Sequence, residues 1–407
     1  MSPPEVVLVP SLDEFSFRAV DFCSRLVSIP SLSGSEAQVV QAIAGEMQLL
    51  GYDAIEIDAM GSVIGTIDSG LPGKAVVFDG HVDTVGVTDR AGWTRDPFGG
   101  AIEGGRLYGR GASDMKGSLA AMVYGAALSA KALEAGILYV CGTVSEEVFE
   151  GAALAAIVDA CRPDYVVIGE STGLGLNLGQ RGRMEILVEA SGVAAHSSTP
   201  HLGVNAVEKM ADVLVRLRSL EMPHDDMLGN GALVLTGMVS SPYPPISVVP
   251  HLCTATFDRR FLVGEDTGSV LGPIKESIAR LQASDPSLLA QVSIARGEHK
   301  TYTGRVISGE KILAAWKTPA DSLVVASARE ALRAAGIEPR EKAYSFCTNG
   351  SGSARLGVPT IGFGAGFEEQ AHTRDEHIEI DQIQRATAGF ASLAQYLTRS
   401  GKQMRLF

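Results

Sequence analysis

The segment AVVFDGHVD, residues 75–83, has the pattern of a buried strand that ends in polar groups. Its apolar run AVVF is short and unbroken, as is typical of a strand covered on both faces. His81 and Asp83 are two residues apart, so on an extended chain their side chains point to the same side. The segment therefore predicts a sheet in which one strand end presents an imidazole and a carboxylate together.

Similar apolar runs recur along the chain and alternate with stretches of helical periodicity. The runs are ILYVCGTV at 137–144, YVVIG at 165–169 and PTIGFG at 359–364. Apolar residues at three- and four-residue spacing predict helices at 13–27, 35–50, 116–135, 151–161, 319–335 and 381–397. Strands that alternate with helices are typical of α/β proteins with a largely buried central sheet. This is the fold class that we predict for most of the chain.

Between about residues 184 and 295 the pattern changes to alternating strands with two amphipathic helices. Strands are predicted at 184–191, 232–239, 252–262 and 290–295, and helices at 204–220 and 268–283. Two halves of this kind resemble a ferredoxin-like sandwich. We therefore predict an inserted α+β domain at 183–298, between two parts of a first domain at 1–182 and 299–407. Short connections at both ends of the insert would place a cleft between the domains.

Composition excludes several classes of protein. The 407 residues exceed the ~250 to 300 at which single cores usually stop growing, which favours two domains. The net charge is −13 and no run of Lys and Arg could follow a phosphate backbone, so we expect no nucleic-acid partner. The opening MSPPEVVLVPSLDEF has acidic residues and prolines where a signal peptide needs a basic and then an apolar region. No apolar run reaches the ~20 residues that span a bilayer. We therefore expect a cytoplasmic protein without membrane contact.

The five cysteines predict neither a disulfide framework nor a thiolate metal site. Their number is odd and no two of them form a C-x-x-C pair. Cys347 lies in the polar segment SFCTNGSGS, but the sequence places no base beside it, so its role stays open.

Acidic and imidazole side chains lie at the ends of the predicted buried strands. Glu146 and Glu147 follow the strand at 137–144, Glu170 ends the next strand, and His372 comes shortly after PTIGFG. Because ligands gather at the carboxyl ends of strands in open α/β sheets, these groups are expected to converge near His81.

A further carboxylate, Asp114, occupies the glycine-rich turn GRGASDMKG just before a helix. Carboxylates crowded beside an apolar sheet repel one another, and divalent cations relieve that repulsion. Two imidazoles with three carboxylates suit zinc or a similar borderline metal, whereas magnesium and calcium prefer oxygen ligands alone. The sequence therefore predicts two divalent cations, zinc in the first place, with cobalt and manganese as alternatives.

Several motifs, taken in order, resemble those of the aminoacylase, glutamate carboxypeptidase and succinyl-diaminopimelate desuccinylase superfamily of dinuclear zinc hydrolases. They are HVDTV at 81–85, GRGASDMKG at 109–117, SEE at 145–147, GEST at 169–172, GVAAHSSTPHLGVNA at 192–206 and AHTRDE at 371–376. The stretches GQRGRMEI at 179–186, FDRRFLVGE at 257–265 and TNG at 348–350 are most similar to the branch of hydrolases linked to selenium metabolism. The resemblance covers nearly the whole chain. It implies a zinc-exopeptidase-like catalytic domain with a mixed central sheet and an inserted lid and dimerisation domain.

The resemblance also implies a role for each motif residue. His81 and Glu170 would bind one metal, Glu147 and His372 the other, and Asp114 both. Asp83 would hydrogen-bond the second nitrogen of His81. Glu146 would act as the general base toward a water molecule.

Further residues are implied on the lid and beside the site. His196 would stabilise the oxyanion of the tetrahedral intermediate, either within its own subunit or across a homodimer formed by the insert. Arg260 would pair with a substrate carboxylate, and the adjacent Arg259 is not expected to do so. Asn349, in the TNG motif, would also contact substrate. In many relatives an asparagine precedes the Val/Ile-Pro step of the lid, whereas Ser247 stands nearest that position here.

These implications predict hydrolysis of an amide bond in an N-acyl amino acid, a dipeptide or a similar small carboxylate-bearing compound. Neither a serine-hydrolase G-x-S-x-G turn nor an early G-x-G-x-x-G dinucleotide motif is present. The alternative is a catalytically silent protein that binds an amino-acid derivative on the same fold. The sequence does not choose the acyl group or the metal.

Overall fold

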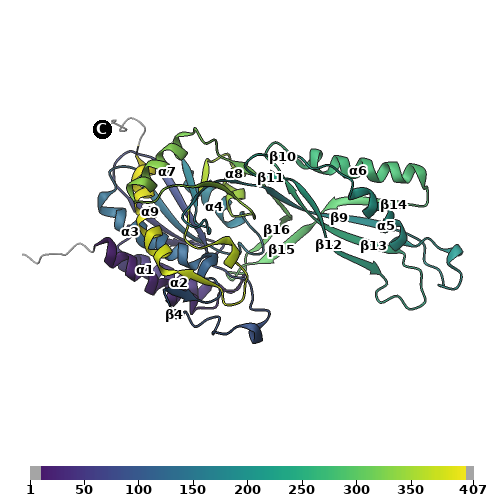
Figure 1. Ribbon diagram of the computed structural model, residues 1–407, viewed down its shortest axis with the longest axis horizontal. Coiled ribbons are helices and arrows are strands. Elements are labelled where there is room, and N and C mark those ends of the chain that lie inside the picture. The colour runs from purple at the N-terminus through teal and green to yellow at the C-terminus, as the bar shows by residue number, and fades with distance from the viewer. Residues whose placement is uncertain (1–10, 400–407) are drawn as a thin grey trace, which may run out of the picture.

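The computed structural model describes residues 11–399. The expectation that the chain has no signal peptide concerns residues 1–15, most of which lie outside the described residues. The centre of the larger domain, at the left of Figure 1, is a mixed sheet. This sheet has nine strands. Its spatial order is β1 (Ala54–Ile57), β2 (Val63–Asp68), β6 (Ile137–Thr143), β3 (Ala75–His81), β7 (Tyr165–Ile168), β20 (Thr360–Gly362), β8 (Leu176–Gln180) and β18 (Trp316–Lys317), with β19 (Glu341–Tyr344) beside β8. Strands β6, β3, β7 and β20 run parallel, so the segments that follow them meet at one edge.

Helices cover both faces of this sheet, and the alternation along β3 shows why. Val76 and Phe78 belong to the core formed with one set of helices, while Val77 belongs to the core on the opposite face. The first set is α1 (Leu12–Val27), α2 (Ala37–Leu50), α3 (Gly117–Ser129), α7 (Leu323–Ala334) and α9 (Ile380–Thr398); α4 (Ala152–Cys161) and α8 (Gly350–Arg355) lie on the other face. The α/β fold class is confirmed, with strands buried on both sides.

A separate three-stranded sheet contains the strand from which the chain leads into α3. It consists of β21 (His377–Glu379), β5 (Arg106–Tyr108) and β4 (Ile102–Glu103). Between β5 and α3 the chain makes a wide helical turn at Ala112–Lys116, in which Asp114 has non-helical backbone angles. This turn brings Asp114 toward the end of β3, as the contacts described below show.

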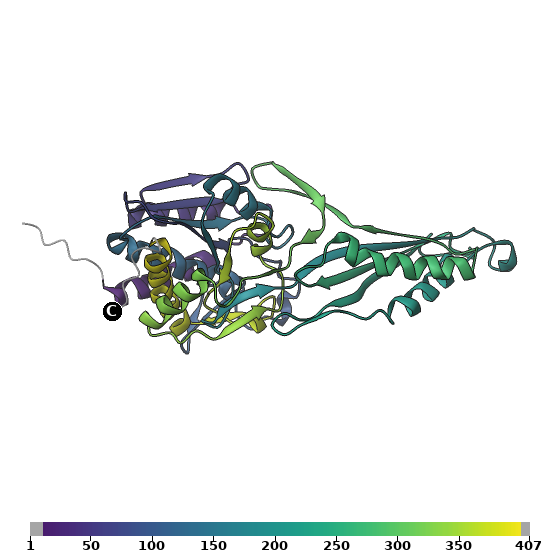
Figure 2. The same cartoon turned by 90° about the horizontal axis from the view of Figure 1, so that it is seen from above.

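The insert has its own sheet and core, and it extends away from the catalytic domain as an elongated arm (Figure 2). Its elements are β9 (Gly182–Ser191), α5 (Ala206–Leu217), β12 (Ala232–Ser241), β13 (Leu252–Phe261), α6 (Thr267–Ser284) and β14 (Leu289–Ile294), and a short hairpin of β10 (His224–Asp225) and β11 (Gly229–Asn230) precedes β12. The strand order β12-β13-β9-β14, antiparallel throughout, is that of a ferredoxin-like sandwich. The predicted architecture of the insert is confirmed.

The return from the insert differs from the predicted short connection. The chain first forms a long hairpin of β15 (Arg296–Lys300) and β16 (Val306–Glu310), and β17 (Ile312–Leu313) then pairs with β9. The hairpin reaches the catalytic domain, where the Tyr302 hydroxyl donates to the Gly61 carbonyl at 2.9 Å. The predicted boundaries at 182/183 and 298/299 fall within β9 and β15, and they stay predictions.

Across residues 11–399, no helix combines the length and the apolar character needed to cross a membrane.

Candidate metal and catalytic site

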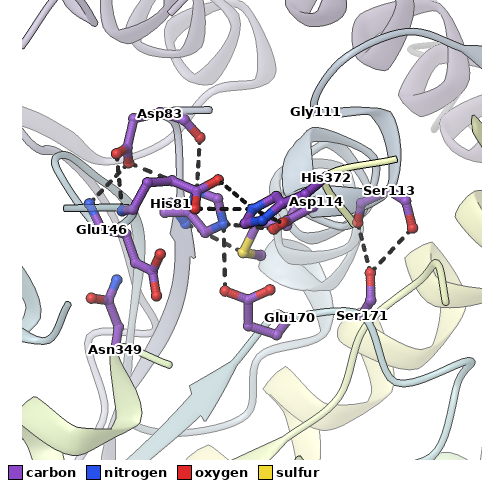
Figure 3. A network of polar contacts seen from close by, with 12 residues as sticks. His81, Asp83, Gly111, Ser113, Asp114, Glu146, Glu170, Ser171, Asn349 and His372 are labelled. Carbon is purple, nitrogen blue, oxygen red and sulfur yellow. Dashed lines mark hydrogen bonds and ion pairs between the residues drawn. The ribbon is translucent and has the colours of Figure 1, made fainter. Parts of the chain in front are cut away.

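His81 ends β3 with its imidazole almost completely buried, at 1% exposure (Figure 3). Its Nδ1 lies 2.9 Å from the backbone carbonyl oxygen of Asp83. Because a carbonyl oxygen can only accept, Nδ1 donates in this bond, and Nε2 is the nitrogen that faces the pocket. Nε2 faces Asp114 Oδ1 at 3.0 Å and Glu170 Oε1 at 3.4 Å. Burial acts to lower the pKa of His81, but the charge of Glu170 and the hydrogen bond to Asp114 outweigh it and raise that pKa well above its ordinary value. An imidazole with one nitrogen held by a carbonyl oxygen and the other directed at carboxylates is the arrangement of a metal ligand.

Asp114 lies between the two imidazoles. Its Oδ1 faces His81, and its Oδ2 lies 3.2 Å from His372 Nε2. The same nitrogen of His372 is 3.1 Å from Glu147 Oε2. Contacts thus link the five residues predicted as metal ligands in one chain. Figure 3 shows Asp114 beside His81 and His372.

The donor atoms are close enough to share cations. Ligand atoms of His81, Glu146 and Glu170 lie within 4.8 Å of one another, and so do those of His81, Asp114 and Glu147. Four carboxylates thus gather around two imidazoles in a largely buried pocket, and divalent cations satisfy such an excess of negative charge. The set therefore fits two metal ions. Glu146, predicted as the base, is as close to His81 and Glu170 as a ligand would be.

Burial and mutual repulsion shift the pKa values of these acids. Burial raises the pKa of Glu170 to about 8 and that of Glu146 well above its ordinary value, although His81 acts in the opposite direction on both. Hydrogen bonds to Asp114 and Glu147 raise the pKa of His372 to about 10. Without cations, the pocket therefore holds protons in their place.

Asp83 contacts His81 differently from the prediction. The carboxylate oxygen Oδ1 is 3.7 Å from His81 Nδ1, beyond hydrogen-bond distance, and it is the backbone carbonyl of Asp83 that accepts. The carboxylate instead accepts the backbone N–H groups of Glu146 at 3.0 Å and Glu147 at 3.1 Å, and the Ser33 hydroxyl at 2.6 Å. Asp83 therefore fixes both His81 and the turn that presents the two glutamates.

Asn349 is occupied by internal hydrogen bonds, which corrects its predicted contact with substrate. Its amide oxygen accepts from the Gly151 N–H at 2.7 Å, and its amide nitrogen donates to Asp79 at 3.1 Å and to Thr143 at 2.9 Å. The side chain is 3% exposed. Both amide protons and the oxygen are thus engaged, and Asn349 ties α8 to β3, β6 and the loop before α4.

Arg260 lies on β13 where the insert meets the catalytic domain. Its Nε donates to Asp258 at 2.6 Å, and its Nη1 is 3.5 Å from Cys347 Sγ. Burial raises the pKa of Cys347 to about 12, which argues against a thiolate nucleophile. Arg259 is buried, and its guanidinium pairs with Glu265 at 2.6 Å within the insert.

His196 is not brought to the pocket of its own chain. It follows the outer end of β9 by five residues and is bridged to Val248 in the neighbouring loop. Its Nδ1 contacts the Ser198 hydroxyl at 2.7 Å. Within residues 11–399, His196 has no hydrogen bond or ion pair to any of the five predicted ligands.

A cavity of about 970 Å³ opens beside Glu147. It is bounded by the loop at 147–152, the beginning of β9, α8 and the β15–β16 hairpin. A β-carbon on Gly297 would lie 3.3 Å from the ring of Phe149, so the hairpin packs closely on the loop that follows the two glutamates. The volume is at the upper end for small-ligand pockets, which span about 300–1,000 Å³. Sequence reasoning missed this hairpin, because its strands have no strong apolar alternation.

Comparison with known proteins assigns this arrangement to a family. The model of peptidase family M20/M25/M40 matches residues 77–396. The chain belongs to the M20/M25/M40 family. It is a metallohydrolase of the deacylase or dipeptidase type.

Two relatives of the M20/M25/M40 chain and one solved structure illustrate the similarity. The uncharacterized protein YgeY of Escherichia coli (strain K12) is 35% identical over 380 residues, which cover 91% of this chain and 92% of that protein. A succinyl-diaminopimelate desuccinylase of Cereibacter sphaeroides is 30% identical, with 90% and 95% covered. The fold is similar to that of aminopeptidase PepT from Bacillus cereus, with a TM-score of 0.74, 20% identity and 94% and 99% of the two chains covered.

Proposed function

We propose that this protein hydrolyses an amide bond in an N-acyl amino acid, a dipeptide or a similar small carboxylate-bearing compound, with two divalent cations as cofactors. The observation that supports this most directly is the position of Asp114, whose two carboxylate oxygens face different imidazoles. The family and its amide-hydrolysing relatives support the reaction type. Within the family, we retain the similarity to the branch linked to selenium metabolism, which defines no substrate.

The proposed ligand sets follow the contacts in the pocket. His81 and Glu170 would hold one cation, His372 and Glu147 the other, and Asp114 both. Zinc suits this mixture of imidazole and carboxylate, and cobalt and manganese are the alternatives. When bound, such cations act as Lewis acids that lower the pKa of water and polarise a carbonyl group.

Glu146 is the group that moves the proton. Its carboxylate would take a proton from the attacking water and return it to the departing amine nitrogen. Burial raises the pKa of Glu146, which suits a group that must keep a proton between these two steps. Asp83 would assist by binding the backbone N–H of Glu146 at 3.0 Å, which limits the movement of the turn.

His196 is proposed to act across a homodimer formed by the insert, where it would donate to the oxyanion of the tetrahedral intermediate. Its exposed position on the arm, away from its own pocket, supports a role at the site of a second copy. Arg260 is retained as the residue that pairs with the substrate carboxylate, through the second N–H of its Nη groups, because one N–H of Nη2 donates to Asp258 and one of Nη1 to Cys347. Both roles are specific enough to test by substitution.

The decisive experiment is a substrate panel on protein of known metal content. The protein is stripped with a chelator and reloaded with zinc, cobalt or manganese, and hydrolysis of N-acyl amino acids and dipeptides is followed by release of the free amine. The proposal expects two bound ions per chain and hydrolysis that the chelator abolishes. Metal-free protein that binds an amino-acid derivative without cleaving it would instead identify a catalytically silent binding protein.

A further inference from the structure

Two short turns present the groups on which the proposed reaction depends. One is the wide turn at 111–116 with Asp114, and the other is the Ser145–Glu147 turn with the base Glu146. In an extended strand the sheet fixes the backbone, but a turn needs other partners for its N–H groups. In both turns, buried carboxylates from distant parts of the chain supply these partners.

Glu376 binds the turn around Asp114. Its Oε1 accepts the backbone N–H groups of Ser113 at 2.9 Å and Asp114 at 3.0 Å, and its Oε2 accepts that of Gly111 at 3.0 Å. The same Oε2 accepts from Arg110 Nη1 at 2.6 Å. Glu376 is completely buried and Arg110 is 4% exposed. A buried carboxylate with four donors fixes the backbone of the turn that directs Asp114 at the two histidines.

Glu36, in the loop before α2, binds the turn around Glu146. Its Oε1 accepts the Ser145 N–H at 3.1 Å and the Ser145 hydroxyl at 3.3 Å, and the carboxylate is completely buried. Ser145 has φ 62°, a left-handed conformation that costs about 1–3 kcal/mol in a residue other than glycine and persists only when its surroundings enforce it. Asp83 accepts the N–H groups of the next two residues, so Glu36 completes the support of the turn.

We propose that Glu376 and Glu36 are positioning residues, Glu376 for the metal ligand Asp114 and Glu36 for the general base Glu146. This inference rests on the proposed function, because it takes the roles of Asp114 and Glu146 from there. It predicts that the two glutamates control different steps. Glu376 controls metal affinity. Glu36 controls turnover, because it binds Ser145 next to the base, whereas the backbone N–H of the ligand Glu147 is held separately by Asp83.

Substitution by glutamine should affect the hydrogen bonds of Glu376 and Glu36 differently. In Glu376 both oxygens accept hydrogen bonds, so in Glu376→Gln the amide NH₂ must face a donor, either a backbone N–H or Arg110. In Glu36 only Oε1 is engaged, and Oε2 is buried without a hydrogen-bond partner within the described part of the chain. Glu36→Gln can therefore keep both bonds to Ser145 with its amide oxygen.

The experiment measures zinc affinity and steady-state kinetics on the same full-length variants. Zinc affinity is measured by competition with a chelating dye, and kcat and KM with the best substrate of the panel. We expect Glu376→Gln to weaken zinc binding by about 10- to 100-fold, as is typical when a group that orients a metal ligand is changed. We expect Glu36→Ala to keep its zinc affinity and KM but to lose about 10- to 100-fold in kcat. Glu36→Gln should restore most of that kcat.

Matched controls come from exposed glutamates. Glu369→Gln lies in the same segment as Glu376, and Glu56→Ala lies on the exposed edge strand; both should match the unmodified protein. If Glu376→Gln does not fold, as judged by circular dichroism, Arg110→Lys provides a milder change of the same contact and should still weaken zinc binding. Unchanged zinc affinity in the folded Glu376 or Arg110 variants would overturn the first assignment.

Equal losses of kcat in Glu36→Gln and Glu36→Ala, or none in either, would overturn the second assignment. If the two glutamates only stabilised the fold, their variants would have lower melting temperatures. The Glu376 variant would then not differ from the Glu36 variant in whether zinc affinity or kcat is reduced. Unmodified protein that neither binds zinc nor cleaves any substrate would overturn the proposed function, and with it this inference. Active unmodified protein with unaffected variants would overturn the inference alone.

Discussion

The pocket at the end of β3 and the loop around His196 are held in different ways. His81 is almost completely buried, and its two nitrogens contact groups from three segments of the chain. His196 is exposed, and its imidazole contacts a serine two residues away. The fold of one chain is therefore enough to position His81, whereas His196 can act only at the pocket of another copy of the chain. The predictions below test this difference.

The largest effect is expected at Glu146, which the fold places among the ligands although we assign it the proton transfer. Glu146→Ala should lower kcat by about 10²- to 10⁴-fold, the usual contribution of a general acid–base group, and should keep both metals. Metal analysis with kinetics is the measurement. Glu147→Ala is the matched variant and should lose metal. Loss of metal from Glu146→Ala would make Glu146 a ligand and sink its assignment as base.

A smaller effect is expected on the arm. His196→Ala should lower kcat by about 10²- to 10³-fold, the usual cost of losing one oxyanion donor. Because we place His196 at the site of the partner, mixing His196→Ala with Glu146→Ala protein should restore part of the activity. In a mixed dimer one site then has both groups. Mixed dimers that stay as inactive as their parents would show that His196 does not act across subunits.

The proton content of the pocket gives the third prediction. With a pKa of about 8 for Glu170 and about 10 for His372, both groups are protonated at pH 7 in protein stripped of metal. Cations bind only the deprotonated forms, so metal uptake should release protons at pH 7, and metal affinity should rise by about tenfold per pH unit for each proton released. Calorimetry in buffers of different ionisation enthalpy counts these protons. Uptake without proton release would contradict the shifts.

The same shift predicts how the stability of stripped protein depends on pH. The pKa of Glu170 is raised from 4.5 to about 8, so its neutral form favours folding. This contribution is complete below pH 4.5 and is lost as the pH rises through 8. Stripped protein should therefore lose stability over this range, and metal-loaded protein should not show this loss. A melting temperature of stripped protein that rises from pH 5 to 8 would speak against it.

The smallest effect is expected where the hairpin ties the arm to the catalytic domain. Tyr302→Phe removes the hydroxyl that donates to Gly61 and should cost about 0.5–1.5 kcal/mol, the usual net value of one hydrogen bond. Chemical denaturation measures it. Tyr243→Phe is the control, since that ring is 77% exposed. A cost no larger than that of the control would show that this contact does not secure the hairpin.

Much of the fold was predictable because buried strands and amphipathic helices leave strong local patterns. The run AVVFDGHVD predicted β3, and the alternation in MEILVEAS predicted most of β9. The β15–β16 hairpin was not predicted, because its residues are mostly exposed or half-buried and owe their position to contacts with the catalytic domain. Only its docking on Gly61 and Phe149 explains why the hairpin lies there.

The sequence alone determined which types of side chain end the central strands, and that their charges call for cations, because strand periodicity and ligand chemistry are local properties. Only the tertiary structure decided how those side chains are used. In the folded protein the amide of Asn349 is hydrogen-bonded to Gly151. The carboxylate of Asp83 accepts the backbone N–H of Glu146, and that of Glu376 accepts the backbone N–H of Asp114. Hydrogen bonds of this kind join residues 60 or more positions apart, so packing selects the partner, and spacing along the chain does not reveal it.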